Sequence, residues 1–78
     1  MYVTPMNTPS ATVAKVIEIS SQSPTSFQDA IDAGVARAAQ SLRNIEGVWI
    51  KEQSLSVADG KVKAYRVIMK VTFVFDGE

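Results

Sequence analysis

The side chains best suited to bind a ligand are one tryptophan and one arginine in the C-terminal half of the chain. Trp49 is the only Trp, and charged residues follow it at Lys51 and Glu52. Such a Trp could stack on a planar ligand, or it could pack at a contact between subunits. Arg66 could hold a phosphate or carboxylate with its planar guanidinium, or it could pair with an acidic residue such as Glu52 on an adjoining strand. Both readings stay open for each residue.

Two carboxylates have a spacing that suits a cation. Asp29 and Asp32 lie three residues apart on the polar face of a predicted helix, so they could share one ion. Calcium takes about six to eight oxygen ligands, which two carboxylates supply only if a symmetry axis of an oligomer multiplies them. The metal ligands therefore stay unassigned. The alternative is a solvated helix start, where negative charge favours the helix dipole.

The residues for catalysis are scarce. The chain contains no His and no Cys, so a general base near neutral pH would have to be a strongly perturbed carboxylate or Lys. We recognise no nucleophile motif, no Gly-rich phosphate loop and no metal-site spacing. We expect that the protein is not an enzyme.

Charge and hydropathy argue against two classes of partner. Eight Lys and Arg balance eight Asp and Glu, so no net field attracts nucleic acid or an anionic membrane. No apolar run approaches the roughly 18 residues of a membrane span, and the uncharged N-terminus does not resemble a secretory signal. We expect no nucleic-acid partner, no membrane partner and a cytoplasmic location.

Hydrophobic periodicity predicts a strand followed by a helix. Residues 12–19 alternate and are rich in β-branched side chains, as in a strand, and residues 20–24 have turn chemistry. The helix would start at a Thr25–Gln28 capping box or at a Ser23 cap. Its apolar stripe spans about five turns. The stripe consists of Phe27, Ala30, Ile31, Gly34, Val35, Ala38, Leu42 and Ile45.

Two further strands follow, joined by a tight turn. Residues 47–57 form a strand whose apolar phase changes, which predicts a β-bulge near residues 51–54. The pair Asp59-Gly60 predicts a hairpin turn because both residues tolerate a positive φ. Residues 61–75 give the strongest strand signal, with one apolar face that should pack on the helix. That face consists of Tyr65, Val67, Met69, Val71, Phe73 and Phe75.

This last strand is longer than one short helix can cover. At about 3.3 Å per residue it extends roughly 50 Å. A chain this short, without disulfides or the usual metal ligands, has a thin core and depends on association. We expect an α+β subunit of β-α-β-β order, with a three-stranded antiparallel sheet curled around one helix and strand edges free for another subunit. Residues 1–10 are expected to be a flexible arm, and residues 11–78 the domain.

The order and spacing of four short motifs resemble the dodecin family, over about residues 12–76. The motifs are Lys15-Val16-Ile17-Glu18-Ile19, Ser23-Pro24-Thr25-Ser26, Val35-Ala36-Arg37-Ala38 and Tyr65-Arg66-Val67. The resemblance implies that twelve β-α-β-β subunits assemble into a hollow sphere. In the flavin-binding members, pairs of flavins stack between subunits, and the family is regarded as a flavin store rather than a catalyst.

The resemblance also implies where a flavin would bind. In flavin-binding members, a Trp at the start of the second strand stacks on the rings, and a Gln after the aromatic residue of the third strand bonds the flavin edge. Those positions are Gly47 and Arg66 here, so the sequence is closer to the branch that lacks this pair, one type of which is described as calcium-binding. Trp49 lies on the same strand face as Gly47, about 7 Å away, and could still reach a ring.

We therefore expect a hollow homododecamer that binds, stores or sequesters a small ligand. FMN or riboflavin is the best candidate, in a pocket between subunits formed by Trp49, Arg66 and Gly47. The alternative is a structural or cation-stabilised assembly without flavin.

Overall fold

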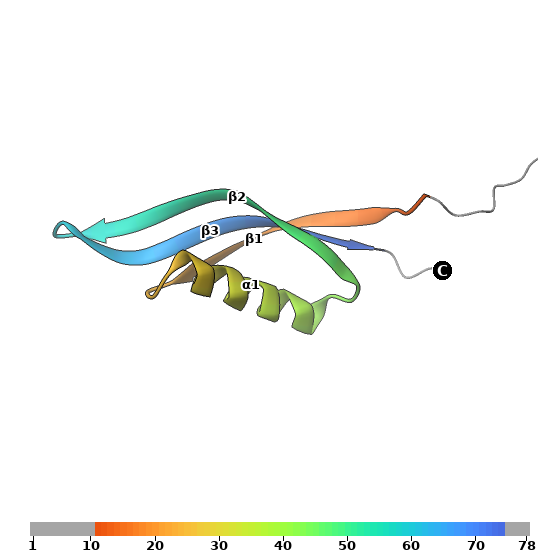
Figure 1. Cartoon of the computed structure of the whole chain (residues 1–78), viewed down its shortest axis with the longest axis horizontal. Helices are drawn as coiled ribbons and strands as arrows, with labels where there is room; N and C mark the ends of the chain where they lie inside the picture. The colour runs from red at the N-terminus through yellow and green to blue at the C-terminus, as the bar shows by residue number, and fades with distance from the viewer. Residues whose placement is uncertain (1–10, 75–78) are drawn as a thin grey trace, which may run out of the picture.

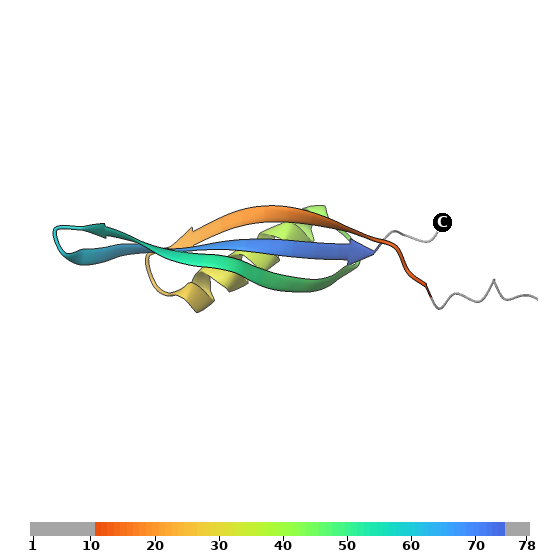
Figure 2. The same ribbon diagram turned by 90° about the horizontal axis from the view of Figure 1, so that it is seen from above.

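The computed structural model describes residues 11–74 and contains three strands and one helix there. They are β1 (Ala14–Ser23), α1 (Phe27–Ser41), β2 (Ile45–Ala58) and β3 (Lys61–Val74). The strands form one antiparallel sheet in the order β1-β3-β2. The helix lies against one face of this sheet (Figure 1), and β3 runs between the other two strands (Figure 2). The predicted α+β fold of β-α-β-β order is confirmed.

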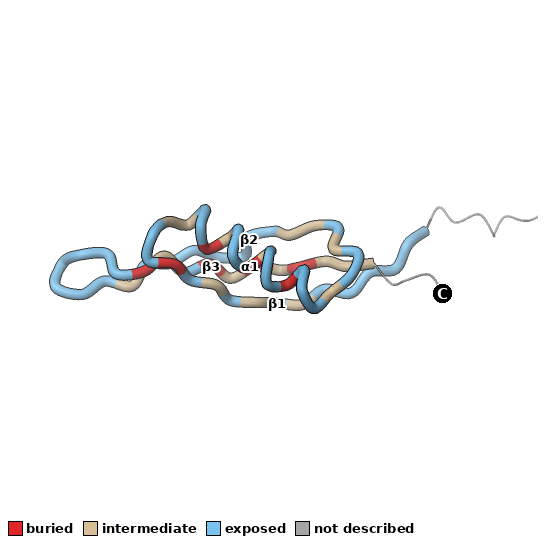
Figure 3. Tube along the Cα trace, turned by 90° about the horizontal axis from the view of Figure 1, so that it is seen from below, coloured by how far each residue is buried: buried red, intermediate tan, exposed pale blue. Residues whose placement is uncertain are grey.

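The core lies between the middle of β3 and the helix. Val67, Met69 and Val71 are fully buried, and Val67 and Met69 form one cluster with Ala30 of α1. Figure 3 shows the buried positions along β3 and on the side of α1 that faces it. The predicted inward face of the last strand is therefore correct through this region. Phe75, which was also assigned to that face, lies outside the described residues.

Gly34 sets how closely the helix approaches the sheet. A Cβ at this position would meet the terminal methyl group of Met69, and it would lie 3.1 Å from the Cβ of Ser21. Both contacts are tighter than ordinary van der Waals packing, so no side chain fits without movement of the neighbours. Small residues at Ala30, Gly34 and Ala38 are buried along one side of α1, and all three belong to the predicted apolar stripe.

The first strand continues through the residues that we expected to form a turn. Ser20–Ser23 pair with β3 as far as Ser23 opposite Tyr65, so the predicted turn over residues 20–24 is wrong for most of its length. The Ser21 hydroxyl donates to the carbonyl oxygen of Ala30 at 2.6 Å. Serine is tolerated here because its hydroxyl satisfies a polar group of the adjacent helix.

The helix is capped by Ser26, which is not one of the predicted caps. Ser26 has extended backbone geometry, and its side chain accepts from the Asp29 backbone N–H at 2.9 Å. The predicted caps at Thr25 and Ser23 are both wrong. The Ser23 hydroxyl is buried instead, where it accepts from the Thr25 N–H at 2.9 Å and donates to Asp29 Oδ2 at 2.6 Å.

The helix also ends earlier than its apolar stripe suggested. Leu42 has extended geometry and donates its N–H to the carbonyl of Ala38 at 2.9 Å. Asn44 then adopts a positive φ of 60°, which reverses the chain. Ile45 therefore begins β2 opposite Phe73 and does not extend the helix. No helix within residues 11–74 is long and apolar enough to cross a membrane.

The bulge and the hairpin turn are where the sequence predicted them. The pairing of β2 with β3 shifts between Ile50 and Glu52, which leaves Lys51 as the extra residue, and two further shifts lie near the strand ends. Asp59 and Gly60 have φ values of 53° and 71°, the geometry of a tight hairpin turn.

Beyond the end of β1, the other two strands continue alone. Tyr65 pairs with Ser23 on one side and Leu55 on the other, and from there to the turn the sheet has only two strands. The ring of Phe27, the first residue of α1, packs edge-on against Tyr65 at 5.2 Å between centroids. The helix thus starts here, and residues 55–64, the hairpin arm, project past it (Figure 1).

One exposed ion pair spans the width of the sheet. Lys51 Nζ lies 2.7 Å from Glu18 Oε2, so β2 is linked to β1 across β3. The hydrogen bond and charge of Lys51 lower the pKa of Glu18, and Glu18 in turn raises the pKa of Lys51. Both side chains are about half exposed, so solvent screens the attraction.

The capping arrangement predicts which hydroxyl stabilises the helix. Ser26→Ala removes an acceptor for an N-terminal N–H and should lower the free energy of unfolding by about 1 kcal/mol. Thr25→Ala is the matched control and should change it by less than about 0.5 kcal/mol. Urea unfolding followed by circular dichroism measures both. A larger effect at Thr25 would contradict the assignment of the cap.

The ion pair predicts a pH effect with a defined sign. Because the folded-state pKa of Glu18 is lowered from its usual 4.5, the stabilisation is present above about that pH and is lost as the pH falls through the folded-state value. Lys51→Met should raise the pKa of Glu18 toward 4.5, as measured by NMR titration of the side-chain carboxyl carbon. Lys63→Met, on the hairpin arm, is the control. An unchanged Glu18 titration in Lys51→Met would show that the pair does not form in solution.

Candidate functional site

The face of the sheet opposite α1, the outer sheet face, carries the residues singled out in the sequence. Side chains alternate along a strand, so the β3 residues between Val67, Met69 and Val71 lie on this face together with their cross-strand neighbours. Figure 2 looks onto it, with the helix behind the strands. It comprises Val16, Glu18, Ser20 and Gln22 of β1, Gly47, Trp49, Glu52 and Ser54 of β2, and Arg66, Ile68, Lys70 and Thr72 of β3.

Gly47 and Trp49 lie side by side on this face. Gly47 pairs with Thr72 and Trp49 with Lys70, with no register shift between them. The Trp49 side chain is 58% exposed, although it is among the largest apolar groups of the chain. A Cβ built on Gly47 would meet nothing within 4 Å. An uncovered indole therefore stands beside open space at the position where the resemblance expects the stacking Trp.

Arg66 lies on the same face but farther along the sheet. It is four residues from Lys70, the partner of Trp49, which corresponds to about 13 Å along an extended strand. Its Nε donates to Gln22 Oε1 of β1 at 3.0 Å. Its β2 partner is Ser54, whereas Glu52 stands opposite Ile68. The hydrogen-bond partner of Arg66 is thus Gln22 rather than the expected Glu52.

Some of the charged side chains on this face form an ion pair and others do not. Lys51 is paired with Glu18, and Lys70 also contributes to the lowered pKa of that carboxyl. Within residues 11–74, neither Arg66 nor Lys70 forms an ion pair. The Oγ1 atom of Thr72 is buried and has no hydrogen-bond partner in the same range. The outer sheet face therefore offers a stacking surface and cationic donors, the groups that bind a planar, negatively charged molecule.

The two carboxylates considered for a cation are engaged within the chain. Asp29 accepts from the Ser23 hydroxyl, and Asp32 Oδ1 accepts from Gln28 Nε2 at 2.8 Å. In the described part of the chain, no group of three or more His, Cys, Asp or Glu side chains could hold a metal ion. Gln28 bonds Asp32 and the N-cap is Ser26, so the predicted Thr25–Gln28 capping box is not formed.

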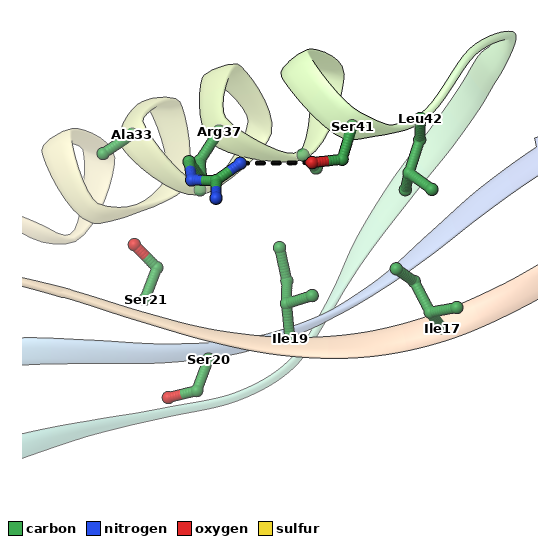
Figure 4. A pocket seen from close by; sticks show the side chains of 10 residues that line it. Ile17, Ile19, Ser20, Ser21, Ala33, Arg37, Ser41 and Leu42 are labelled. Atoms are coloured by element: carbon green, nitrogen blue, oxygen red, sulfur yellow. Dashed lines mark hydrogen bonds between the residues drawn. The ribbon is translucent and has the colours of Figure 1, made fainter.

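A groove that the sequence did not predict lies on the other side of the sheet, between α1 and β1. It has a volume of about 430 Å³. In Figure 4, Ile17 and Ile19 point from β1 toward the helix, and Arg37 Nη1 donates to Ser41 Oγ at 3.2 Å along its wall. None of Gly47, Trp49 and Arg66 lines it. The small helical residues around Gly34 were the available signal, but the same residues also predict close packing.

Comparisons with known proteins agree with this architecture. The family model described as Dodecin matches residues 13–76. The dodecin of Thermus thermophilus is 33% identical over 61 residues, which cover 78% of this chain and 88% of that protein.

Two solved structures show how far the likeness extends. The dodecin from Streptomyces davaonensis has a TM-score of 0.81 and 32% identity, covering 87% of this chain and 100% of that one. The calcium dodecin of Mycobacterium tuberculosis, described as calcium chelating, has a TM-score of 0.72 and 36% identity, covering 85% and 94%. Since the family match spans all four secondary-structure elements and the fold agrees with these structures, the chain belongs to the dodecin family.

Proposed function

We propose that this protein is a non-enzymatic, hollow homo-oligomer of twelve subunits that binds and stores a small planar ligand, with FMN or riboflavin as the first candidate. The observation that carries the proposal is the 58% exposed side chain of Trp49. It lies beside the open space above Gly47, on a sheet face that α1 leaves uncovered.

Self-association is supported by the apolar surface that one chain leaves in water. Leu55, Val57 and Val62 of the hairpin arm are 48%, 59% and 44% exposed. A two-stranded hairpin is at best marginally stable alone in water, and exposed apolar side chains on such an arm favour contact with another molecule. The two edge strands, β1 and β2, also each keep one side free for pairing in the described range. A second copy of the chain is the partner that would cover these groups.

Ligand binding is supported by the geometry around Trp49. The indole stands on the same face as Gly47 and one side-chain repeat along the strand, so it can take the role that the resemblance gives to a Trp at Gly47. A glycine there leaves room for a flat ring to lie next to the indole. A second copy packed over the outer sheet face would enclose the ligand, as in a pocket between subunits.

A cation-stabilised assembly without flavin is the second candidate. It is favoured by the 36% identity to the calcium dodecin and by Gly47 and Arg66, which replace the family's flavin-binding Trp and Gln. Since each chain offers Asp29 and Asp32 but no larger cluster in its described part, the ion would need carboxylates from several copies. In that case calcium, and not flavin, would raise the melting temperature of the assembly.

The assembly is tested by its mass. Multi-angle light scattering should give a value near twelve times the 8.5 kDa chain. Val57→Asp combined with Val62→Asp places two charges on the hairpin arm and should shift the protein to smaller species, because a buried unpaired charge is costly. Gln40→Asp, at an exposed position of α1, is the control and should keep the mass. A compact wild-type monomer at micromolar concentration would refute the proposal.

The ligand is tested by titrating FMN and riboflavin with the protein and following flavin fluorescence. Stacking on an indole should quench the fluorescence, and Trp49→Ala should weaken binding about tenfold, since stacking on an aromatic side chain contributes roughly 1–3 kcal/mol. Ile50→Val, one residue along β2, is the control, and the mass of each variant shows that assembly is kept. If the wild type leaves the fluorescence of both flavins unchanged, it does not bind flavin.

A further inference from the structure

The groove between α1 and β1 has walls that are mainly apolar. Ile17 and Ile19 of β1 are half-buried and point toward the helix, and Leu42 at the helix end points toward β1 (Figure 4). The small residues Gly34 and Ala38 line the groove on the helix side. Its volume of about 430 Å³ is in the range of sites that bind small organic molecules. The groove therefore has the size and the lining that a small apolar group requires.

One cation lies on the wall of this groove without a carboxylate beside it. Among the described residues that line the groove, only Arg37 is charged. Its Nη1 donates to Ser41 Oγ at 3.2 Å, about one helical turn away, so the guanidinium lies along the groove (Figure 4). Within residues 11–74, the other N–H groups of Arg37 form no hydrogen bond or ion pair. These groups are available to an anion.

The hydroxyl groups of the lining narrow the choice of occupant. The Ser21 hydroxyl is engaged with the carbonyl oxygen of Ala30, and Ser20 points away from the groove (Figure 4). The Ser41 hydroxyl accepts from Arg37 and has its own O–H as a second donor beside the guanidinium. An occupant with one anionic end and no other polar group matches this distribution. A carboxylate fits best, because its two oxygens match the planar fork of an arginine.

The length of the groove sets the length of the apolar part. The lining extends along β1 from Ile17 to Ser21, about 13 Å. Along α1 it extends from Ala33 to Leu42, about 14 Å. A carboxylate at Arg37 leaves part of this length to the chain. With carbon–carbon bonds of about 1.5 Å in a zigzag, an unbranched chain of roughly six to ten carbons fits.

We propose that this groove binds unbranched aliphatic carboxylates of medium chain length, with the carboxylate at Arg37 and Ser41. The chain lies along Ile17 and Leu42, where it replaces water on their apolar surface. The groove is on the opposite side of the sheet from Trp49. The inference therefore goes beyond the proposed flavin site and does not depend on it.

The chain is tested by titrating the assembled protein with hexanoate, octanoate and decanoate, each below its micelle-forming concentration, in a calorimeter. Two additional methylene groups should tighten binding about tenfold, as long as they are covered by the groove. In methyl NMR spectra, octanoate should shift the signals of Ile17, Ile19 and Leu42. The signals of Val57 and Val62 on the hairpin arm are the control and should stay in place.

The carboxylate is tested by comparing octanoate with 1-octanol, which has the same chain without the charge. The wild type should bind octanoate about fivefold more tightly, the upper end of what an exposed ion pair contributes. Arg37→Gln should remove this difference by weakening octanoate alone, and Arg37→Lys should keep part of it, because Lys retains the charge but not the planar fork. Lys61→Gln, which removes a cation from the hairpin arm, is the control and should keep the full difference.

Three results would overturn the proposal. Equal binding of octanoate to the wild type and to Arg37→Gln would show that the guanidinium does not hold the carboxylate. Unchanged methyl signals of Ile17 and Leu42 would show that another occupant, residues 1–10 or a second copy of the chain, covers the groove. Shifts of signals throughout the protein together with a loss of mass would show detergent action instead of binding at one site. None of these results bears on the quenching of flavin fluorescence, which tests the proposed function separately.

Discussion

The packing of β3 against a single short helix is the interaction on which the rest of the structure depends. Val67, Met69 and Val71 are buried by it, and Gly34 allows the backbone of α1 to approach closely. One helix of 15 residues covers only part of one face of a sheet whose two longer strands, β2 and β3, have 14 residues each. The rest of the sheet is left to water or to other molecules. The proposed assembly and the proposed flavin site concern these uncovered parts: the hairpin arm and the outer sheet face.

Because side chains alternate along a strand, the two faces of β3 have different roles. From Val67 to Val71 every second residue is buried, and the alternate positions bring Arg66, Ile68, Lys70 and Thr72 into one line on the outer sheet face. The core therefore fixes the rows in which Trp49 and Arg66 stand without contacting either side chain. This arrangement lets residues of the outer sheet face change without disturbing the packed core.

Much of the fold could be predicted because its signals are local. The alternation of β3, the change of phase in β2 and the Asp59-Gly60 pair each depend on residues close in the sequence, and the structure has all three features. The errors fell where tertiary contacts decide between equal local options. Ser23, Thr25 and Ser26 are all competent caps, but Ser23 is buried at the end of β1, and Ser26 takes that role.

In the candidate site, too, local features could be predicted from the sequence and long-range contacts could not. That Trp49 shares a face with Gly47 follows from a period of two, and the sequence predicted it. The partner of Arg66 could not be predicted, because Gln22 lies 44 positions away in the sequence and only the register of β1 on β3 brings them together. The groove between α1 and β1 was missed for a similar reason, since small helical residues do not show whether the space beside them is filled.

The extra residue at Lys51 has an evolutionary consequence. Before it, Val48 and Ile50 pair with helix-facing residues of β3, and after it Gln53 and Leu55 do so, although the two pairs differ in parity. Trp49 lies on the outer sheet face and Leu55 pairs with the helix-facing Tyr65. Deletion of one residue here would move one of these two side chains to the opposite face of the sheet. Homologues should therefore tolerate substitutions in β2 far more readily than single-residue insertions or deletions, and length variation should concentrate at the tip of the hairpin.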